Sequence, residues 1–127
     1  MATVELRFSA LPEHVRTARL VAAAVARRAG VDEAVLDELR LAVGEACIRA
    51  VGLHQSVGIT APVKVALIEE EKQFSIEVGA GDNDAEEDEM GLAVISGLVD
   101  DVEVSAGEHG GLIRMTWPTA PQTVVLP

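Results

Sequence analysis

Aromatic residues and cysteine are scarce in this chain, and their scarcity limits what it can build. The 127 residues contain no Tyr, one Trp, two Phe and one Cys. The core must therefore consist of Ala, Val, Leu and Ile, and no disulfide can form within the chain. Cys47 falls in the apolar pattern of a helix, which predicts a packed thiol. The three His are scattered without metal-ligand spacing, so we expect surface or turn positions for them and no metal site.

Positive charge is also scarce. Ten Lys and Arg stand against 21 Asp and Glu, which gives a formal net charge of -11. A nucleic-acid surface needs a basic stripe that neutralises phosphates, so we expect no direct contact with nucleic acid. The sequence shows no signal peptide, no lipidation signal and no apolar run of transmembrane length. We therefore expect a cytoplasmic protein that does not contact a membrane.

The hydrophobic pattern predicts one α/β domain over residues 1–118 and a frayed tail over 119–127. Alternating apolar residues predict strands at 3–8, 63–68, 74–78, 102–105 and 112–117. Helical spacing predicts helices at 12–30, at 90–99, and from a cap at Asp32 to a stop formed by Gly52 and the stretch 56–62. This order is typical of a two-layer α/β sandwich, with a mixed, mostly antiparallel sheet covered on one face by three helices.

The segment 39–50, Leu-Arg-Leu-Ala-Val-Gly-Glu-Ala-Cys-Ile-Arg-Ala, carries an acid and a base on one side of a predicted helix. Glu45 and Arg49 are four residues apart, so their side chains are neighbours on an α-helix. Taken alone, the two residues are consistent with a solvent-exposed ion pair on a helix, an arrangement that stabilises the helix by about 0.3–0.5 kcal/mol.

This helix resembles the N-box of ATPases of the GHKL superfamily, most closely that of bacterial anti-sigma serine kinases, where the pattern is Glu-Ala-x-x-Asn-Ala. Three further segments carry the resemblance, which extends over residues 3–117: 6–11 (LRFSAL), 90–101 (MGLAVISGLVDD) and 110–116 (GGLIRMT). The resemblance implies a GHKL, histidine-kinase-type ATPase fold. It also implies that Glu45 is the general base, and that Arg49 stands where the family has its magnesium-binding Asn.

The resemblance locates a nucleotide site whose residues depart from the family pattern. Ala80 stands where the family has the Asp that recognises adenine, and Asp82 could replace it only if the loop shifted by two residues. Gly91 begins a predicted helix whose free N–H groups could bind an anion, although it is equally a simple helix-entry glycine. Gly111 stands in place of a family threonine.

The segment between this loop and the next helix is short and acidic. Residues 83–89 alone separate them, which leaves little chain for a lid over a triphosphate. Arg49 cannot ligate magnesium, although its guanidinium suits a phosphate. We therefore predict a degenerate nucleotide site that needs no cofactor, with magnesium-bound ATP or ADP as the alternative.

The first predicted helix offers a partner surface. Arg19 matches a family Arg that contacts both the sigma factor and the anti-anti-sigma protein, and Arg16 lies one turn before it. Arg is enriched among the interface residues that dominate affinity. The simpler interpretation is that these arginines only solvate the outer face of a helix.

The resemblance implies an anti-sigma factor that sequesters an alternative sigma factor and is released by a STAS-type anti-anti-sigma protein. It further implies a homodimer formed through the first strand and helix. Two alternatives stay open: an active serine/threonine kinase that phosphorylates the anti-anti-sigma partner, and a GHKL-like interaction module unrelated to sigma factors.

Overall fold

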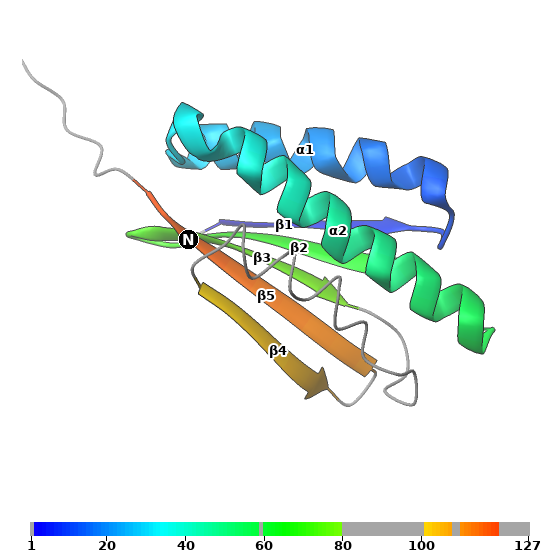
Figure 1. The fold of residues 1–127 in the computed structure, drawn as a ribbon. Coiled ribbons are helices and arrows are strands. Elements are labelled where there is room, and N and C mark those ends of the chain that lie inside the picture. The colour runs from blue at the N-terminus through cyan, green and yellow to red at the C-terminus, as the bar shows by residue number, and fades with distance from the viewer. Residues whose placement is uncertain (1, 59, 80–100, 108–109, 120–127) are drawn as a thin grey trace, which may run out of the picture.

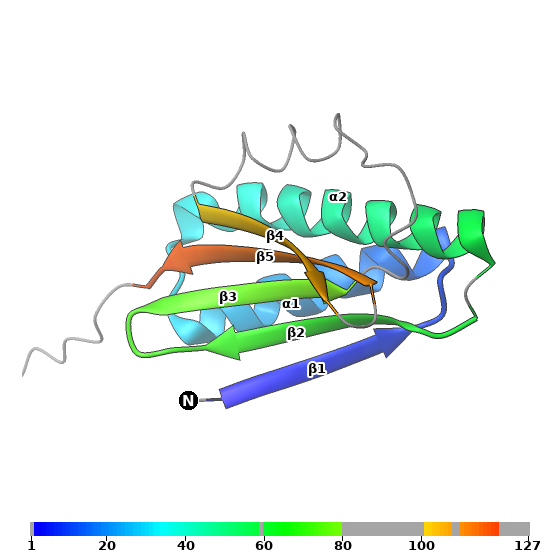
Figure 2. The same ribbon diagram turned by 90° about the horizontal axis from the view of Figure 1, so that it is seen from below.

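The computed structural model describes residues 2–58, 60–79, 101–107 and 110–119. Five strands form one sheet in the order β1-β2-β3-β5-β4, and two long helices lie over one of its faces (Figure 1, Figure 2). The elements in chain order are β1 (Ala2–Phe8), the short 3-10 helix η1 (Pro12–His14), α1 (Val15–Ala29), α2 (Glu33–Val57), β2 (Val63–Glu69), β3 (Gln73–Gly79), β4 (Asp101–Gly107) and β5 (Gly110–Pro118). The predicted α/β sandwich is confirmed.

The sheet follows the alternation read from the sequence. Every ladder among the described strands is antiparallel. Ile76 of β3 lies opposite Leu67 of β2 and Met115 of β5, and all three side chains are buried. Because paired residues share a face of a sheet, these side chains form one apolar surface, and the two helices cover it.

The helices begin and end at residues with a physical reason to do so. Asp32 caps α2 by accepting a hydrogen bond from the Ala34 N–H at 3.0 Å. Gly30 ends α1 with φ 100°, a conformation that costs little only for glycine. Gly58 ends α2 in the same way, with φ 69°.

Of the two stop signals predicted for the second helix, the stretch 56–62 is correct and Gly52 is wrong. Gly52 lies inside α2, where no atom comes within 4 Å of an added Cβ, and the helix continues to Val57. A glycine in a helix interior costs only about 1 kcal/mol, and burial of Val51 and His54 on the same helix offsets that cost. Tertiary packing therefore overrides the local stop signal.

His54 also departs from its expected place on the surface. Its side chain is only 3% exposed, and its Nδ1 lies 3.0 Å from the carbonyl oxygen of Ala61. This contact joins the last turn of α2 to the segment that leads into β2.

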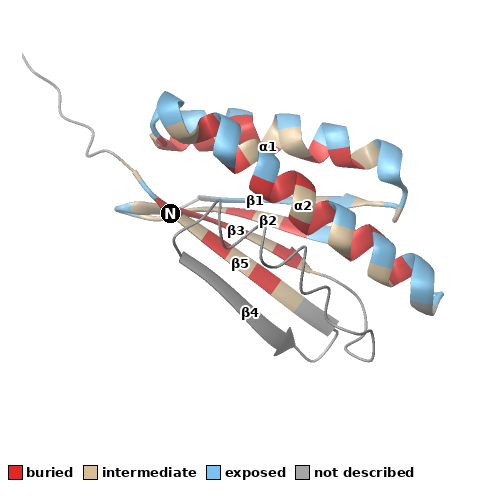
Figure 3. Cartoon of the chain, viewed as in Figure 1, coloured by how far each residue is buried: buried red, intermediate tan, exposed pale blue. Residues whose placement is uncertain are grey.

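The core is built from aliphatic side chains of both layers (Figure 3). The apolar side predicted for the second helix is buried throughout, at Leu36, Leu39, Val43, Ala46, Cys47 and Ala50. On α1 the same holds for the predicted positions except Val25, which is partly buried, while Ala23 joins the buried set. Phe74 and Trp117 supply the buried aromatic side chains among the residues whose burial is described.

Several predictions fall outside the described residues: the third helix at 90–99, the acidic segment 83–89, and residues 120–127 of the tail. Thr119, the first tail residue, donates its N–H to the Lys72 carbonyl at 3.1 Å. Neither described helix combines the length and apolar character that a membrane crossing requires.

Two leucines on α2 test the assignment of its inner face. Leu39 is fully buried and Leu41 is 53% exposed. We expect Leu39→Ala to lower the free energy of unfolding by about 2–5 kcal/mol, because it leaves a cavity in the core. Leu41→Ala should change it by less than about 0.5 kcal/mol. Urea unfolding measures both, and equal losses would contradict the assignment.

Candidate functional site

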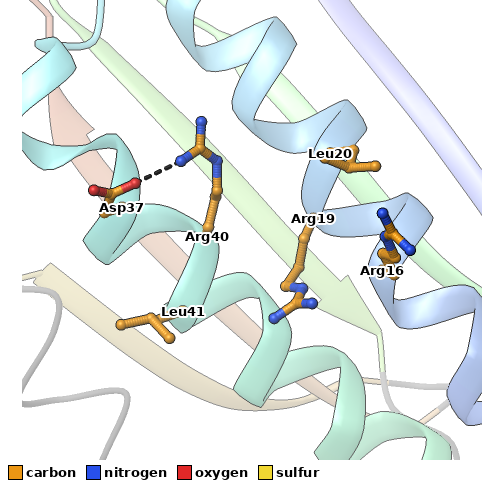
Figure 4. Close-up of a pocket in the computed structure, with 6 residues that line it drawn as sticks. All are labelled: Arg16, Arg19, Leu20, Asp37, Arg40 and Leu41. Carbon is orange, nitrogen blue, oxygen red and sulfur yellow. Dashed lines mark hydrogen bonds and ion pairs between the residues drawn. The ribbon is translucent and has the colours of Figure 1, made fainter.

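A groove runs between α1 and α2 on the side of the helices that faces away from the sheet (Figure 4). Its volume is about 410 Å³. Six side chains line it, and we call it the α1/α2 groove: Arg16, Arg19 and Leu20 from α1, and Asp37, Arg40 and Leu41 from α2. The i, i+3 and i+4 spacing of the α1 residues places them on one helix face. The structure thus brings together the two arginines predicted to contact a partner.

The two predicted arginines are unpaired cations within the described part of the chain. Arg40 pairs with Asp37 at 2.5 Å, whereas Arg16 and Arg19 have no hydrogen bond or ion pair to any described residue. Other arginines of the protein do find carboxylates, namely Arg7, Arg27 and Arg114. Two uncompensated positive charges in a groove stand out on a protein of net charge -11.

Large apolar side chains stand beside these cations. Leu20 is 57% exposed and Leu41 is 53% exposed, and Ile48 on α2 is 54% exposed. Leu41 and Ile48 are seven residues apart, which places them on the same side of α2. Exposed apolar residues grouped with arginine are typical of a protein-binding surface.

Arg19 crosses from α1 to α2 (Figure 4). Its side chain lies over Gly44, where an added Cβ would come within 2.8 Å of the Arg19 Cδ. Burial raises the pKa of the Cys47 thiol to about 12, and the positive charge of Arg19 opposes this rise in part. Cys47 is therefore a packed thiol, as predicted, and its raised pKa favours the neutral form over the nucleophilic thiolate.

Glu45 and Arg49 lie on the other flank of α2. Both are partly buried, and neither lines the α1/α2 groove. At about 100° per residue, Arg49 is turned roughly 140° from Gly44, which faces α1. The two residues form no ion pair with each other. The exposed helical ion pair is thus not what the structure shows.

Arg49 has donors that no described residue satisfies. Its Nε and Nη1 are buried and have no hydrogen-bond partner among the residues that the structure describes. Buried guanidinium donors without acceptors cost free energy, and an anion could satisfy them. A divalent cation could not, because the same position already carries a positive charge.

The structure tests the other predicted nucleotide-site residues only in part. Ala80, Asp82 and Gly91 lie outside the described residues. Gly111 lies in β5, where it pairs with Ala106 of β4. Of the predicted nucleotide-site residues, Glu45 and Arg49 are therefore the two that the structure places together, on α2.

The sequence as a whole matches a known family. The model of the histidine kinase-like ATPase domain family aligns with residues 8–117. The chain belongs to this family. The GHKL resemblance drawn from the four short segments is thereby confirmed. No curated protein matches the chain.

A solved structure shares the fold of this ATPase-like domain. It is described as the crystal structure of the RsbU and RsbW domains of Rv1364c from Mycobacterium tuberculosis. The TM-score is 0.72 at 18% sequence identity, and the similarity covers 99% of this chain. The chain spans 35% of the length of that protein, so the likeness concerns one part of a larger molecule.

The resemblance to GHKL ATPases implies a nucleotide bound with magnesium. The described residues do not supply the ligands that magnesium would need. Arg49 carries a positive charge at the position where the resemblance predicts the metal ligand, and no described residue accepts a hydrogen bond from its buried Nε and Nη1. Among the residues that the structure describes, no group of three or more His, Cys, Asp and Glu could hold a metal ion. The arrangement on α2 could receive an anion beside Arg49, but its described residues offer no set of ligands for the metal that would neutralise charge during phosphoryl transfer.

A polar cluster that sequence reasoning missed lies on the sheet face away from the helices. Arg114 of β5 donates to Glu77 at 2.8 Å, to Glu70 at 2.8 Å and to the Ser75 hydroxyl at 3.3 Å. Ser75 also contacts the Thr116 hydroxyl at 3.1 Å. The available signal was the antiparallel register, which places Glu77 opposite Arg114. The cluster ties β3 to β5 and explains how Ser75 can be fully buried.

Arg49 and Arg114 make a matched pair for a stability test. We expect Arg49→Met to change the free energy of unfolding by less than about 1 kcal/mol or to raise it, because unsatisfied buried donors are removed. Arg114→Met should lower it by about 1–3 kcal/mol, because Glu70 and Glu77 lose their shared partner. Urea unfolding at pH 7 measures both. A large loss for Arg49→Met would show that its guanidinium is satisfied within the protein.

Proposed function

We propose that this histidine kinase-like ATPase domain is an anti-sigma factor that acts by binding proteins. It holds an alternative sigma factor, and a STAS-type anti-anti-sigma protein releases that factor by competing for the domain. The observation that carries the proposal is the pair of unpaired arginines, Arg16 and Arg19, beside exposed leucines in the α1/α2 groove. The resemblance to anti-sigma serine kinases, and the fold shared with a chain that contains an RsbW domain, support it.

The mechanism is mutually exclusive binding. The exposed part of α1 is short, so two partners that both need Arg19 cannot occupy it together. An Arg guanidinium forms bidentate hydrogen bonds with carboxylates, and burial in an interface strengthens them. Arg19 is the central contact of this surface, and Arg16 extends it by one turn.

The nucleotide site has lost its role in this mechanism. Arg49 excludes the magnesium that the family uses, so the domain requires neither ATP nor ADP as a cofactor. Release therefore depends on the concentration and affinity of the anti-anti-sigma protein, and not on phosphorylation.

Assembly and location follow from the same proposal. β1 is an edge strand of the sheet, and no other described strand pairs with its outer side, where a second copy could pair. An isologous homodimer through β1 and α1 is the expected form. Because sigma factors act with RNA polymerase, the domain works in the cytoplasm and contacts the transcription machinery only through protein.

The test uses purified proteins. The alternative sigma factors and STAS-domain proteins encoded in the source genome are titrated one by one with the full chain. We expect one sigma factor to bind, and one STAS protein to displace it. Arg19→Ala should weaken both interactions by about 2 kcal/mol, which is roughly thirtyfold, with an unchanged melting temperature.

Arg28→Ala is the matched control for Arg19→Ala. Arg28 is an exposed arginine of the same helix that does not line the groove, and its replacement should leave both affinities unchanged. Equal losses in the two variants would remove Arg19 from the partner surface. If no sigma factor or STAS protein binds, the domain is an interaction module of another kind.

The rival function is an active kinase, and Glu45 at the position of the general base is the observation that favours it. Isothermal titration with ATP or ADP in magnesium should show no binding tighter than about 1 mM, because the metal ligand is absent. Labelled phosphate should not pass from ATP to the bound STAS protein. Micromolar ADP binding together with phosphate transfer would establish the kinase.

A further inference from the structure

Gly44 forms a notch on the α1-facing side of α2, and the Arg19 side chain lies in it. An added Cβ at Gly44 would stand 2.8 Å from the Arg19 Cδ, 3.6 Å from its Cγ and 3.7 Å from its Nη1. A real Cβ cannot approach another carbon to 2.8 Å, so any side chain at position 44 would displace Arg19. The three nearest atoms among the described residues, apart from those of the chain neighbours of Gly44 and of the nearby backbone of its helix, all belong to Arg19.

Because the Arg19 side chain lies in this notch, its positive charge is held at one place between the two helices. An exposed arginine samples many rotamers, and ordering it on binding costs free energy. Because Arg19 already lies across α2, its guanidinium is held between the two helices, inside the α1/α2 groove (Figure 4). Arg16 stands one turn away on α1, and Leu20 and Leu41 flank the groove from the two helices.

We propose that Gly44 is a positioning residue for Arg19, and that the α1/α2 groove receives a polypeptide segment of the partner in which carboxylates flank an aliphatic side chain. This rests on the proposed function, since it names the chemistry of the segment that the partner inserts. The carboxylates pair with Arg16 and Arg19. The aliphatic side chain lies between Leu20 and Leu41.

Charge complementarity selects this occupant. The groove gathers three arginines against the single carboxylate of Asp37, which Arg40 already engages, on a protein of net charge -11. Leu20 and Leu41 are each more than half exposed, so the segment must also cover apolar surface. A nucleic acid would meet repulsion from the acidic remainder of the protein and offers no aliphatic group for the leucines.

A thermal double-mutant cycle tests the notch without any partner. Gly52→Ala is the matched control, because Gly52 lies in the same helix with open space around its Cβ position. It should raise the melting temperature by roughly 3–6 °C, through helix propensity alone. In the native sequence, Gly44→Ala should raise the melting temperature by less than Gly52→Ala does, because the Arg19 side chain must move to make room for the new Cβ. In a protein that already carries Arg19→Ala, Gly44→Ala should raise the melting temperature by as much as Gly52→Ala does. Additive effects in this cycle would overturn the positioning role.

Binding then tests the occupant with the sigma factor or STAS protein that binds the native chain. Gly44→Ala should weaken that affinity about tenfold while Gly52→Ala leaves it unchanged. Leu41→Ser should weaken it by a similar factor, and Leu11→Ser, an exposed leucine outside the groove, should not. Raising the salt concentration should weaken binding of the native chain more than that of Arg19→Ala.

The possible outcomes separate the two proposals. Absence of any partner from the panel contradicts the proposed function, while the thermal cycle still decides whether Gly44 holds Arg19. Equal affinities of Gly44→Ala and the native chain for a bound partner would overturn this inference and leave the function standing. Binding of a single-stranded oligonucleotide that is lost in Arg19→Ala would overturn the assignment of a polypeptide occupant.

Discussion

The close packing of α1 and α2 over the sheet is the constraint on which the rest of the structure depends. With almost no aromatic residues, the helices bury alanines, namely Ala18, Ala22 and Ala26 on α1 and Ala42, Ala46 and Ala50 on α2. Small side chains allow two helices to approach each other and still share one sheet surface. The same closeness brings Arg19 of α1 onto Gly44 of α2, so the geometry of the groove is a consequence of the composition of the core.

Helix α2 serves two surfaces from one rigid element. Its flank toward α1 helps to form the groove, and its other flank carries Glu45 and Arg49, the two residues predicted for a nucleotide site. A substitution on one flank need not disturb the other, because the buried stripe between them holds the helix in place. This separation gives a physical reason why the residues predicted for a nucleotide site and those predicted for a partner surface could change independently of each other.

The sequence predicted those parts of the fold that depend on the spacing of apolar residues along the chain and on residues that begin or end a helix. Alternation located all five described strands, and the cap at Asp32 and the stop at Gly30 were correct. The stop predicted at Gly52 was wrong because the free-energy cost of a glycine inside a helix is small compared with the stabilisation from burying Val51 and His54. The surface or turn position predicted for His54 was wrong because no sequence pattern indicates that its imidazole will be buried beside the Ala61 carbonyl. For the candidate site, the sequence predicted Arg16, Arg19, Glu45 and Arg49, but it did not indicate that the groove between α1 and α2 contains the first two and excludes the others.

Taken alone, the sequence determined the class of the fold and the family, because these depend on residue type and spacing along the chain. Tertiary structure decided which arginines are paired and which are not. Arg114 finds Glu70 and Glu77 across the sheet, whereas Arg16 and Arg19 are left without carboxylates among the described residues. That difference depends on which distant residues the fold brings within a few ångströms, and spacing along one helix or one strand carries no such information.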